Sequence, residues 1–318
     1  MSNPFKPGSH PIAYDLDPRT YHKINTGKRG EPGFTLSRSE LEEFALCPHR
    51  WLRAPARKVT DPMRWGALLD CIVLTPQQFQ TVYSVAPETY LAEPKRKGDP
   101  SEEKPWNYNA TACKEWRANE IASGKEVTTA EDASLAWLAA KRLREDPMIN
   151  DFLNACRTQV QVFVEYTDPD TGITIPIKCM IDLMPPMGTS FGSCIGDFKT
   201  TDSAGLRDWQ RAVASQRHHY QAALYLDAVN AATGREYNRF VHVIQEKDEP
   251  FETARRELSQ EFLMLGRIQY RRDLANYCRC LERNRWPGYD DADSLDELPE
   301  IIGGWRMTPP PAWMLQEF

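Results

Sequence analysis

The spacing of apolar residues changes near Val160, and this change constrains the fold more than any other feature of the sequence. The segment QVQVFVEYTDPDTGITIPIKCMIDLMP alternates as two strands do, with the turn sequence DPDTG between them. A third short strand is predicted in GSCIGDFKTT, and a fourth in RFVHVIQE, whose β-branched residues indicate a buried or central position. Helical spacing predicts one long helix over 204–232 and another over 253–285. This order predicts an α/β core, in which a mixed sheet carries helices on its faces.

The remaining chain divides into stretches of different character. Residues 1–34 contain Pro and Gly without a periodic apolar pattern, so we expect an irregular N-terminal arm. A helix begins after Ser37, the predicted N-cap. Residues 84–127 are polar and Pro-containing, which predicts a loop-rich, mobile insertion. We therefore expect one domain over 35–290 that contains this insertion, followed by a C-terminal tail over 291–318.

Composition is typical of a globular protein with a sizeable core, at 318 residues and 41% hydrophobic content. No apolar run approaches the roughly 20 residues that cross a bilayer, and the N-terminus lacks the apolar core of a secretory signal. The expected location is therefore the cytoplasm, and the eight scattered cysteines are expected to be reduced thiols. A net charge of -6 argues against a surface coated with nucleic-acid-binding charge, although a local basic groove is compatible with it.

Three polar residues on two predicted strands suggest the chemistry. Asp182 ends one apolar strand, and Asp197 and Lys199 lie two apart on the next, so strand alternation puts the latter pair on one face. If the strands pair, the two carboxylates converge, and two hard oxygen ligands with waters suit Mg²⁺ or Mn²⁺. A lysine beside such a metal orients or deprotonates an attacking water, or offsets charge on a phosphate. The pattern fits metal-assisted phosphodiester hydrolysis, and from the residues alone strand charges held in ion pairs remain the alternative.

Five segments carry a more specific signal because they occur in a fixed order. They are LSRSELEEFALCPHRWL, RWGALLDCIVLTP, the strand pair IPIKCMIDLMP and IGDFKTT, HHYQAALYLDAV, and GRIQYRRDLANYCRCLERNRWPGY. Together they resemble the PD-(D/E)xK nuclease superfamily and, within it, the RecE-type exonucleases of phage and prophage recombination modules, which are related to RecB nuclease domains. The resemblance covers about residues 35–290 and implies a restriction-endonuclease-like fold, a mixed β-sheet core flanked by α-helices.

The resemblance also implies roles for individual residues. The positions that match the family are the metal ligands Asp182, Asp197 and the Phe198 carbonyl, and the catalytic residues Lys199, Gln221 and Tyr225. Gln221 and Tyr225 lie four apart and hence on one helix face, where the family uses them to position the substrate phosphate or the lysine. Without the resemblance, an ordinary amphipathic helix with a buried tyrosine is the preferred explanation of their spacing.

The sequence departs from the family pattern at two positions. Asp70 stands where the family helix usually offers a metal-binding histidine. An aspartate also binds Mg²⁺, so Asp70 is a candidate ligand, with a helix-face charge in a salt bridge as the alternative. The family's glutamate ahead of the hairpin aligns with Gln161, while Glu165 lies on the same strand face. Which of the two enters the site is open.

The cofactor expected from the resemblance is Mg²⁺ or Mn²⁺. Relatives with an iron–sulfur cluster use four cysteines with wider C-terminal spacing. Only three candidates occur here, Cys47, Cys278 and Cys280, so no iron–sulfur cluster is expected.

A nuclease must also hold a polyanion. The candidate DNA-binding residues are Arg64, Arg207, Arg211 and Arg217, which can contact phosphates without reading bases. Solvated helix faces paired with nearby acidic residues are the alternative. RecE-like nucleases are ring-shaped oligomers, so the resemblance implies a homo-oligomer that concentrates basic side chains in a channel.

The resemblance therefore implies a metal-dependent exonuclease that degrades double-stranded DNA ends in a bacterial or phage-infected cell, and the 5′ to 3′ polarity comes from the resemblance alone. Such an enzyme would leave a 3′ tail for a single-strand annealing protein. Three alternatives stay open: a single-strand or structure-selective nuclease of the same superfamily, an inactive nuclease fold that binds DNA or protein, and a phosphatase on small substrates.

Overall fold

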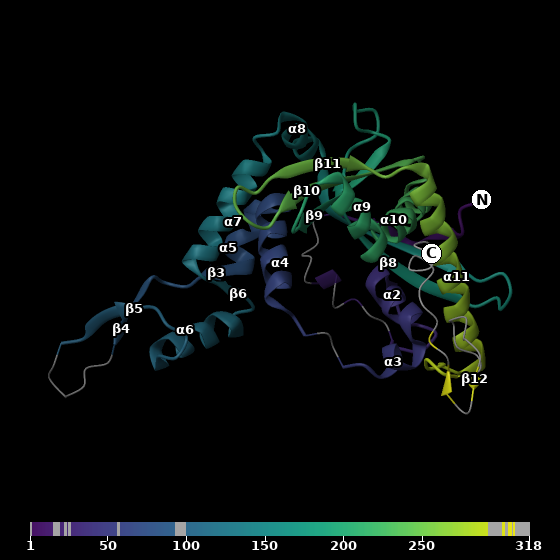
Figure 1. Ribbon diagram of the computed structural model, residues 1–318, viewed down its shortest axis with the longest axis horizontal. Coiled ribbons are helices and arrows are strands. Elements are labelled where there is room, and N and C mark those ends of the chain that lie inside the picture. Colours follow the sequence, from purple (N-terminus) through teal and green to yellow (C-terminus); the bar gives the residue numbers. More distant parts are fainter. Residues whose placement is uncertain are drawn as a thin grey trace.

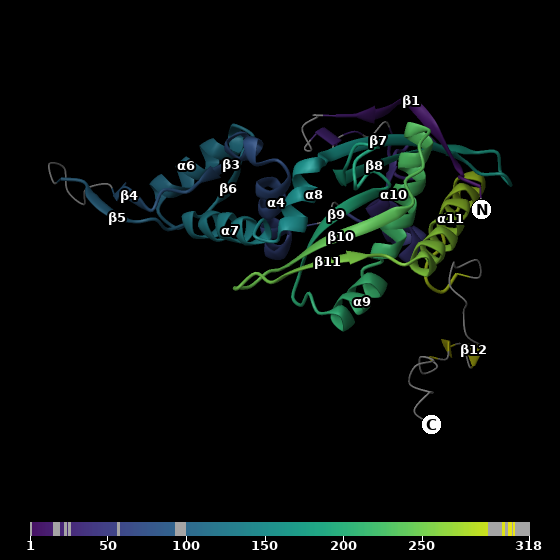
Figure 2. The same ribbon diagram turned by 90° about the horizontal axis from the view of Figure 1, so that it is seen from above.

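The computed structural model describes residues 2–14, 20–21, 24, 27–55, 58–92, 100–291, 301–302, 305–306 and 308. Within these residues, the central element is a seven-stranded mixed sheet in the order β1–β7–β8–β9–β10–β11, with β2 paired to β8. Helices flank the sheet in both views (Figures 1 and 2). This arrangement confirms the predicted α/β fold with a mixed sheet between helices.

The strands of the central sheet are β1 (Phe5–Ala13), β2 (Leu36–Ser37), β7 (Arg157–Thr167), β8 (Thr174–Met184), β9 (Cys194–Thr201), β10 (Arg239–Glu246) and β11 (Thr253–Glu257). The helices are α2 (Arg38–Leu46), α3 (Pro48–Arg53), α4 (Asp61–Leu74), η1 (Pro76–Gln78), α5 (Phe79–Val82), α6 (Thr111–Ala122), α7 (Ala130–Leu143), α8 (Pro147–Ala155), α9 (Leu206–Ser215), α10 (His218–Thr233) and α11 (Gln260–Arg283). Short two-stranded sheets are formed by β3 (Tyr83–Val85) with β6 (Glu126–Thr128), β4 (Thr89–Ala92) with β5 (Glu102–Pro105), and β12 (Ile301–Ile302) with β13 (Trp305–Arg306).

The local signals at helix starts and turns are confirmed. The Ser37 side chain accepts a hydrogen bond from the Glu40 backbone N–H and caps α2. β7 and β8 form the predicted antiparallel hairpin, whose turn is closed by the Gly172 N–H bonded to the Asp168 carbonyl. Gly172 has a φ of 70°, a conformation that glycine adopts without steric cost.

The strands that carry the candidate site meet in an unusual way. β8 and β9 are recorded as paired at Leu183 and Gly196, whereas β9 runs parallel to β10 along its whole length. A parallel pair needs a crossover connection, which α9 and α10 supply. A Cβ at Gly196 would lie 2.8 Å from the Phe152 ring, so the glycine lets β9 pack closely against α8. Asp182 and Asp197 each lie one residue from the Leu183–Gly196 pair, so this antiparallel register places them opposite each other on β8 and β9.

Two apolar clusters hold β9 from its opposite faces. The larger includes Ile195 and joins the sheet to α2, α3, α10 and α11. The second includes Phe198 and joins β9 and β10 to α4, α7 and α8. Since protein interiors are close-packed, a strand held on both faces has little freedom to move, which suits a site that must hold its geometry.

The two predicted long helices have wrong bounds: the first is split into two helices, and the second begins later than predicted. The helix predicted over 204–232 is split into α9 and α10 because Arg217 takes a left-handed conformation with a φ of 54°. An arginine carries no sequence signal for that conformation. The helix predicted over 253–285 begins only at Gln260, because residues 253–257 pair with β10 as the edge strand β11. Cross-strand pairing here overrides a short helical pattern.

Two stretches predicted to be irregular are ordered instead. Residues 5–13 form β1, which pairs antiparallel with β7 at the other edge of the sheet. The insertion predicted over 84–127 holds strands of two small sheets and α6, although residues 93–99 lie outside the described part. Figures 1 and 2 show this segment projecting away from the central sheet. None of the described helices combines the length and the hydrophobicity that a membrane span requires.

Candidate active site

Asp197 lies at the centre of the candidate site, and the side chains of Lys199 and Gln221 contact its carboxylate. Its side chain is only 2% exposed. Lys199 Nζ lies 2.6 Å from Oδ2, and Gln221 Nε2 of α10 donates a 2.8 Å hydrogen bond to Oδ1. The predicted convergence of Asp197 and Lys199 on one strand face is therefore present in the structure. Gln221 reaches the same group, although it contacts the aspartate rather than the lysine.

Asp182 approaches the same point from β8. Its Oδ2 accepts a 3.2 Å hydrogen bond from the Phe198 backbone N–H, and its carboxyl group interacts electrostatically with that of Asp197. The Phe198 carbonyl, the third predicted ligand, faces Lys199 Nζ at 3.5 Å. The structure thus brings the carboxyl groups of Asp182 and Asp197 together, with the Phe198 main chain beside them.

The electrostatics of the three acidic groups show a shortage of positive charge. Burial, reinforced by the negative charge of Asp197, raises the pKa of Asp182 well above its usual value. Burial also raises the pKa of Asp70 on α4 to about 7, although Lys199 opposes the shift. For Asp197, burial acts upward too, but Lys199, His242 and the interaction with Asp182 outweigh it and lower the pKa to about 2. One lysine therefore compensates one carboxylate fully and leaves the other two favouring protonation.

The lysine itself is held in its charged form. Burial alone would lower the pKa of Lys199, but Asp197 and Asp182 reverse this effect and raise it above the usual value. Its side chain is 26% exposed, whereas that of Asp197 is 2% exposed. A charged lysine at an open site can bind a phosphate oxygen.

The donor set fits a magnesium-type ion with few protein ligands. Among the described residues, no three His, Cys, Asp or Glu side chains form a group that could hold a metal, so Asp70 does not complete a three-acid cage. Mg²⁺ is commonly bound through one or two carboxylates, with waters and substrate phosphates filling the other positions. Asp182, Asp197 and the Phe198 carbonyl provide such a set of oxygen atoms.

The remaining predicted site residues differ in their surroundings. Tyr225 lies one helical turn after Gln221 and is buried, which raises its pKa well above the usual value, with Cys179 adding to the effect. Gln161 is fully buried, and neither polar atom of its side chain has a hydrogen-bond partner among the described residues. Glu165 is exposed at its strand position. The strand face that carries both residues is therefore covered at Gln161 and open to solvent at Glu165.

The four predicted DNA-binding arginines fall into two groups. Arg64 on α4 and Arg211 on α9 are largely exposed, and each pairs with an acidic residue on its own helix. Arg207 on α9 is exposed. Arg217 is different, because it forms a 3.0 Å ion pair with the buried Asp273 and lies over the Tyr220 ring at 4.1 Å. Its guanidinium group holds α10 against α11, so we leave it out of the proposed DNA surface.

Sequence patterns missed a group of buried rings behind Asp197. We call Trp209, His218 and His242 the ring cluster; they come from α9, α10 and β10 and lie within 5.1 to 5.7 Å of one another by ring centroids. A histidine within an apolar strand, in RFVHVIQE, was the available signal, but the partner strand that places it beside Asp197 could not be read from the sequence.

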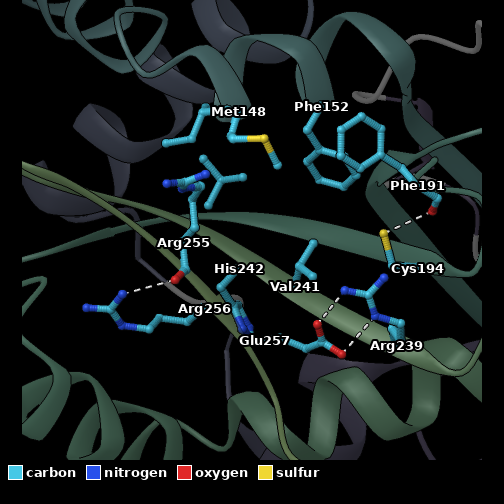
Figure 3. A pocket seen from close by; sticks show the side chains of 12 residues that line it. Met148, Phe152, Phe191, Cys194, Arg239, Val241, His242, Arg255, Arg256 and Glu257 are labelled. Atoms are coloured by element: carbon cyan, nitrogen blue, oxygen red, sulfur yellow. Dashed lines mark hydrogen bonds and ion pairs between the residues drawn. The ribbon is translucent and has the colours of Figure 1, made fainter.

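A separate cavity of about 360 Å³ lies between α8 and the β10–β11 pair. Its floor includes Met148, Phe152 and Val241, and the Arg239–Glu257 ion pair borders it (Figure 3). None of the three candidate site aspartates lines this cavity. His242 of the ring cluster does line it, so the cavity borders the residue that is paired with Asp197.

Comparison with known proteins decides the family. The model for PDDEXK-like domains of unknown function (DUF3799) matches residues 35–297. The chain belongs to this family. The match confirms the expected PD-(D/E)xK superfamily. No curated protein matched the sequence.

A solved structure supports the fold of the whole PDDEXK-like chain. A protein described as "Putative exonuclease" from Eubacterium rectale is similar at a TM-score of 0.55, with 13% identity over 92% of this chain and 97% of the other. At such identity the similarity shows the fold alone. Two further structures are SSO0001 (TM-score 0.26, 17% identity, 49% and 66% coverage) and Scheffersomyces stipitis Rai1 (TM-score 0.28, 11% identity, 86% and 74% coverage). Their scores are too low to support an argument.

Proposed function

We propose that this PDDEXK-like protein is a Mg²⁺- or Mn²⁺-dependent deoxyribonuclease that hydrolyses phosphodiester bonds at double-stranded DNA ends, from 5′ to 3′. One observation carries the proposal: Asp182, Asp197 and Lys199 converge from two strands, and Gln221 fixes the orientation of Asp197. A nuclease fold makes DNA the natural substrate class. The end preference and the polarity rest on the resemblance to RecE-type exonucleases.

The side chains divide the work of hydrolysis. Asp182, Asp197 and the Phe198 carbonyl would hold the metal, which when bound supplies Lewis-acid stabilisation of phosphate charge and a more acidic water. Gln221 keeps the Asp197 carboxylate in one orientation. Lys199, charged and partly exposed, would bind a non-bridging phosphate oxygen and stabilise the charge that builds up as water attacks phosphorus. Its raised pKa favours this electrostatic role over that of a general base.

The DNA path and the assembly are part of the same proposal. Arg207 and Arg211 on α9, which follows the site strand directly, and Arg64 on α4 can contact backbone phosphates. By resemblance, the functional form is a homo-oligomer, with a ring as its arrangement. Its product would be a 3′ single strand, which an annealing protein would bind during phage-type recombination in the cytoplasm.

A second candidate is an inactive nuclease fold that binds DNA or a partner protein. Two observations favour it: Asp70 replaces the family's histidine, and no three-acid group assembles among the described residues. Retention of Lys199 and of the Asp182–Asp197 contact argues against it.

Cleavage of end-labelled duplexes distinguishes these candidates. Purified protein with Mg²⁺ or Mn²⁺ is given linear duplex labelled at either the 5′ or the 3′ end, together with circular duplex and single strands. The proposal expects metal-dependent release of the 5′ label first, with circular DNA intact. Asp197→Asn should abolish the release, and Asp151→Asn, which alters an exposed aspartate on α8, should not. Binding without cleavage by the wild-type protein would establish the inactive module instead.

A further inference from the structure

The ring cluster contains buried nitrogen atoms that lack partners. Trp209, His218 and His242 are 3%, 4% and 1% exposed. Trp209 Nε1, His218 Nδ1 and both ring nitrogens of His242 have no hydrogen-bond partner among the described residues. Burying a polar group without a hydrogen bond costs free energy. Phe240, two residues earlier on the same strand face, is a buried apolar ring whose centroid lies 5.1 Å from that of His242. An imidazole at position 242 therefore requires an explanation.

The strand register places His242 beside the proposed metal ligand. His242 on β10 is directly paired with Asp197 on β9, so the two side chains project from the same face of the sheet. His242 Nε2 lies 4.0 Å from Asp197 Oδ2, the oxygen that Lys199 contacts. The side chains of His242 and Asp197 are almost fully buried, at 0% and 2% exposure.

The ring nitrogens of His242 determine what it can do for this carboxylate. Both are buried, and neither has a hydrogen-bond partner among the described residues. A neutral imidazole has one N–H donor and one acceptor nitrogen. Asp197 Oδ2 lies 4.0 Å from Nε2. The tautomer with its proton on Nε2 therefore has a carboxylate oxygen nearby as a hydrogen-bond acceptor, whereas the other tautomer turns an acceptor nitrogen toward that oxygen.

We propose that His242 is a positioning residue, which donates its Nε2 proton to Asp197 Oδ2 and holds that carboxylate ready for a divalent cation. The 4.0 Å separation exceeds a direct hydrogen bond, so the donation uses a small rotation of the imidazole or one bridging water. Gln221 donates to Oδ1, and the two donors together fix the carboxylate plane. Outer hydrogen bonds of this kind orient metal ligands. The inference rests on the proposed metal-dependent function.

Metal binding, measured without DNA, tests this role. The Mn²⁺ dissociation constant is determined by calorimetric titration for wild type, His242→Phe and His242→Gln. His242→Phe keeps a ring but removes the donor, and should raise the dissociation constant about 10- to 100-fold. His242→Gln returns an N–H near the position of Nε2 and should recover most of the affinity. His219→Phe is the matched control, because His219 is equally buried but bonds to Val213 and Gln269.

The outcomes separate the inference from the function. If His242→Phe binds Mn²⁺ as tightly as wild type while Asp197→Asn loses binding, the positioning role is overturned and the proposed function stands. The same holds if His219→Phe weakens Mn²⁺ binding as much as His242→Phe does. If the wild type neither binds Mn²⁺ nor cleaves DNA, the proposed function is overturned, and the role of His242 with it. Circular dichroism establishes that each variant is folded, and His242→Met provides a second donor-free side chain should the phenylalanine variant fail to fold.

Discussion

Two groups of aspartates in this protein have different surroundings. Between α10 and α11, Asp227 contacts Arg267, Arg271 and Tyr270, and Asp273 contacts Arg217 and Arg272. In the candidate active site, Asp70, Asp182 and Asp197 share one lysine among the described residues, Lys199, and Asp197 also faces the His242 imidazole.

The difference shows how one fold uses the same residue type for two purposes. At the helix interface each carboxylate is matched by guanidinium groups, so its charge serves to hold two helices together. In the site the carboxylates are under-compensated, which costs stability unless a cation or protons are added. Four substitutions test this distinction, beginning with the largest effect.

Asp197→Asn should lower DNA cleavage at least about a thousand-fold, because it removes a proposed metal ligand and the partner of Lys199. Initial rates of label release, measured at saturating Mg²⁺, provide the comparison. Asp151→Asn serves as the control, and wild-type rates in Asp197→Asn would contradict the assigned role.

Asp273→Asn should destabilise the fold by about 3 kcal/mol, because it leaves Arg217 and Arg272 without their buried partner. Urea unfolding followed by circular dichroism measures the change. Protein that remains folded should still cleave DNA, since the substitution lies outside the site. A loss of cleavage at unchanged stability would place Asp273 in the machinery instead.

Asp70→Asn should stabilise the metal-free protein by about 1–2 kcal/mol at pH 8. The pKa of Asp70 is raised to about 7, so the folded protein keeps a proton that the unfolded chain releases near pH 4. Wild-type stability is therefore lost as pH rises from about 4 to about 7, and the variant lacks this loss. Unfolding at several pH values in a chelator measures the difference. A difference that shrinks over this window would contradict the raised pKa.

Arg211→Ala should weaken DNA binding only a few-fold and reduce the salt dependence of binding by about one phosphate contact. Binding of duplex to the Asp197→Asn background at several salt concentrations measures the effect without cleavage. Glu261→Ala, which changes an exposed residue of α11, is the comparison. An unchanged salt dependence would remove Arg211 from the DNA surface.

Much of the fold and the candidate centre followed from local signals in the sequence. Strand alternation placed Asp197 and Lys199 on one face, and the order of the motifs indicated the PD-(D/E)xK superfamily. These features depend on spacing along one element or on the order of elements. Asp182 was predicted to join them only if its strand paired with theirs, and that pairing is what the structure adds.

The features that were missed depend on contacts between distant residues. The helix breaks at Arg217, whose left-handed backbone conformation has no sequence signal. The guanidinium group of Arg217 pairs with Asp273, 56 residues away in the chain. The edge strand β11 exists through its pairing with β10. The register of β9 against β10 places His242 beside Asp197, and this pairing cannot be predicted from either strand alone. No pattern within one segment encodes these partners.

The central claim is that Asp182 and Asp197 meet to bind a divalent cation. Crystals of the wild-type protein soaked with Mn²⁺ and measured by anomalous scattering test it most directly. The expected result is a strong peak between the two carboxylates and the Phe198 carbonyl, which disappears in Asp182→Asn crystals. A peak elsewhere, or none at this position in fully soaked wild-type crystals, would contradict the claim.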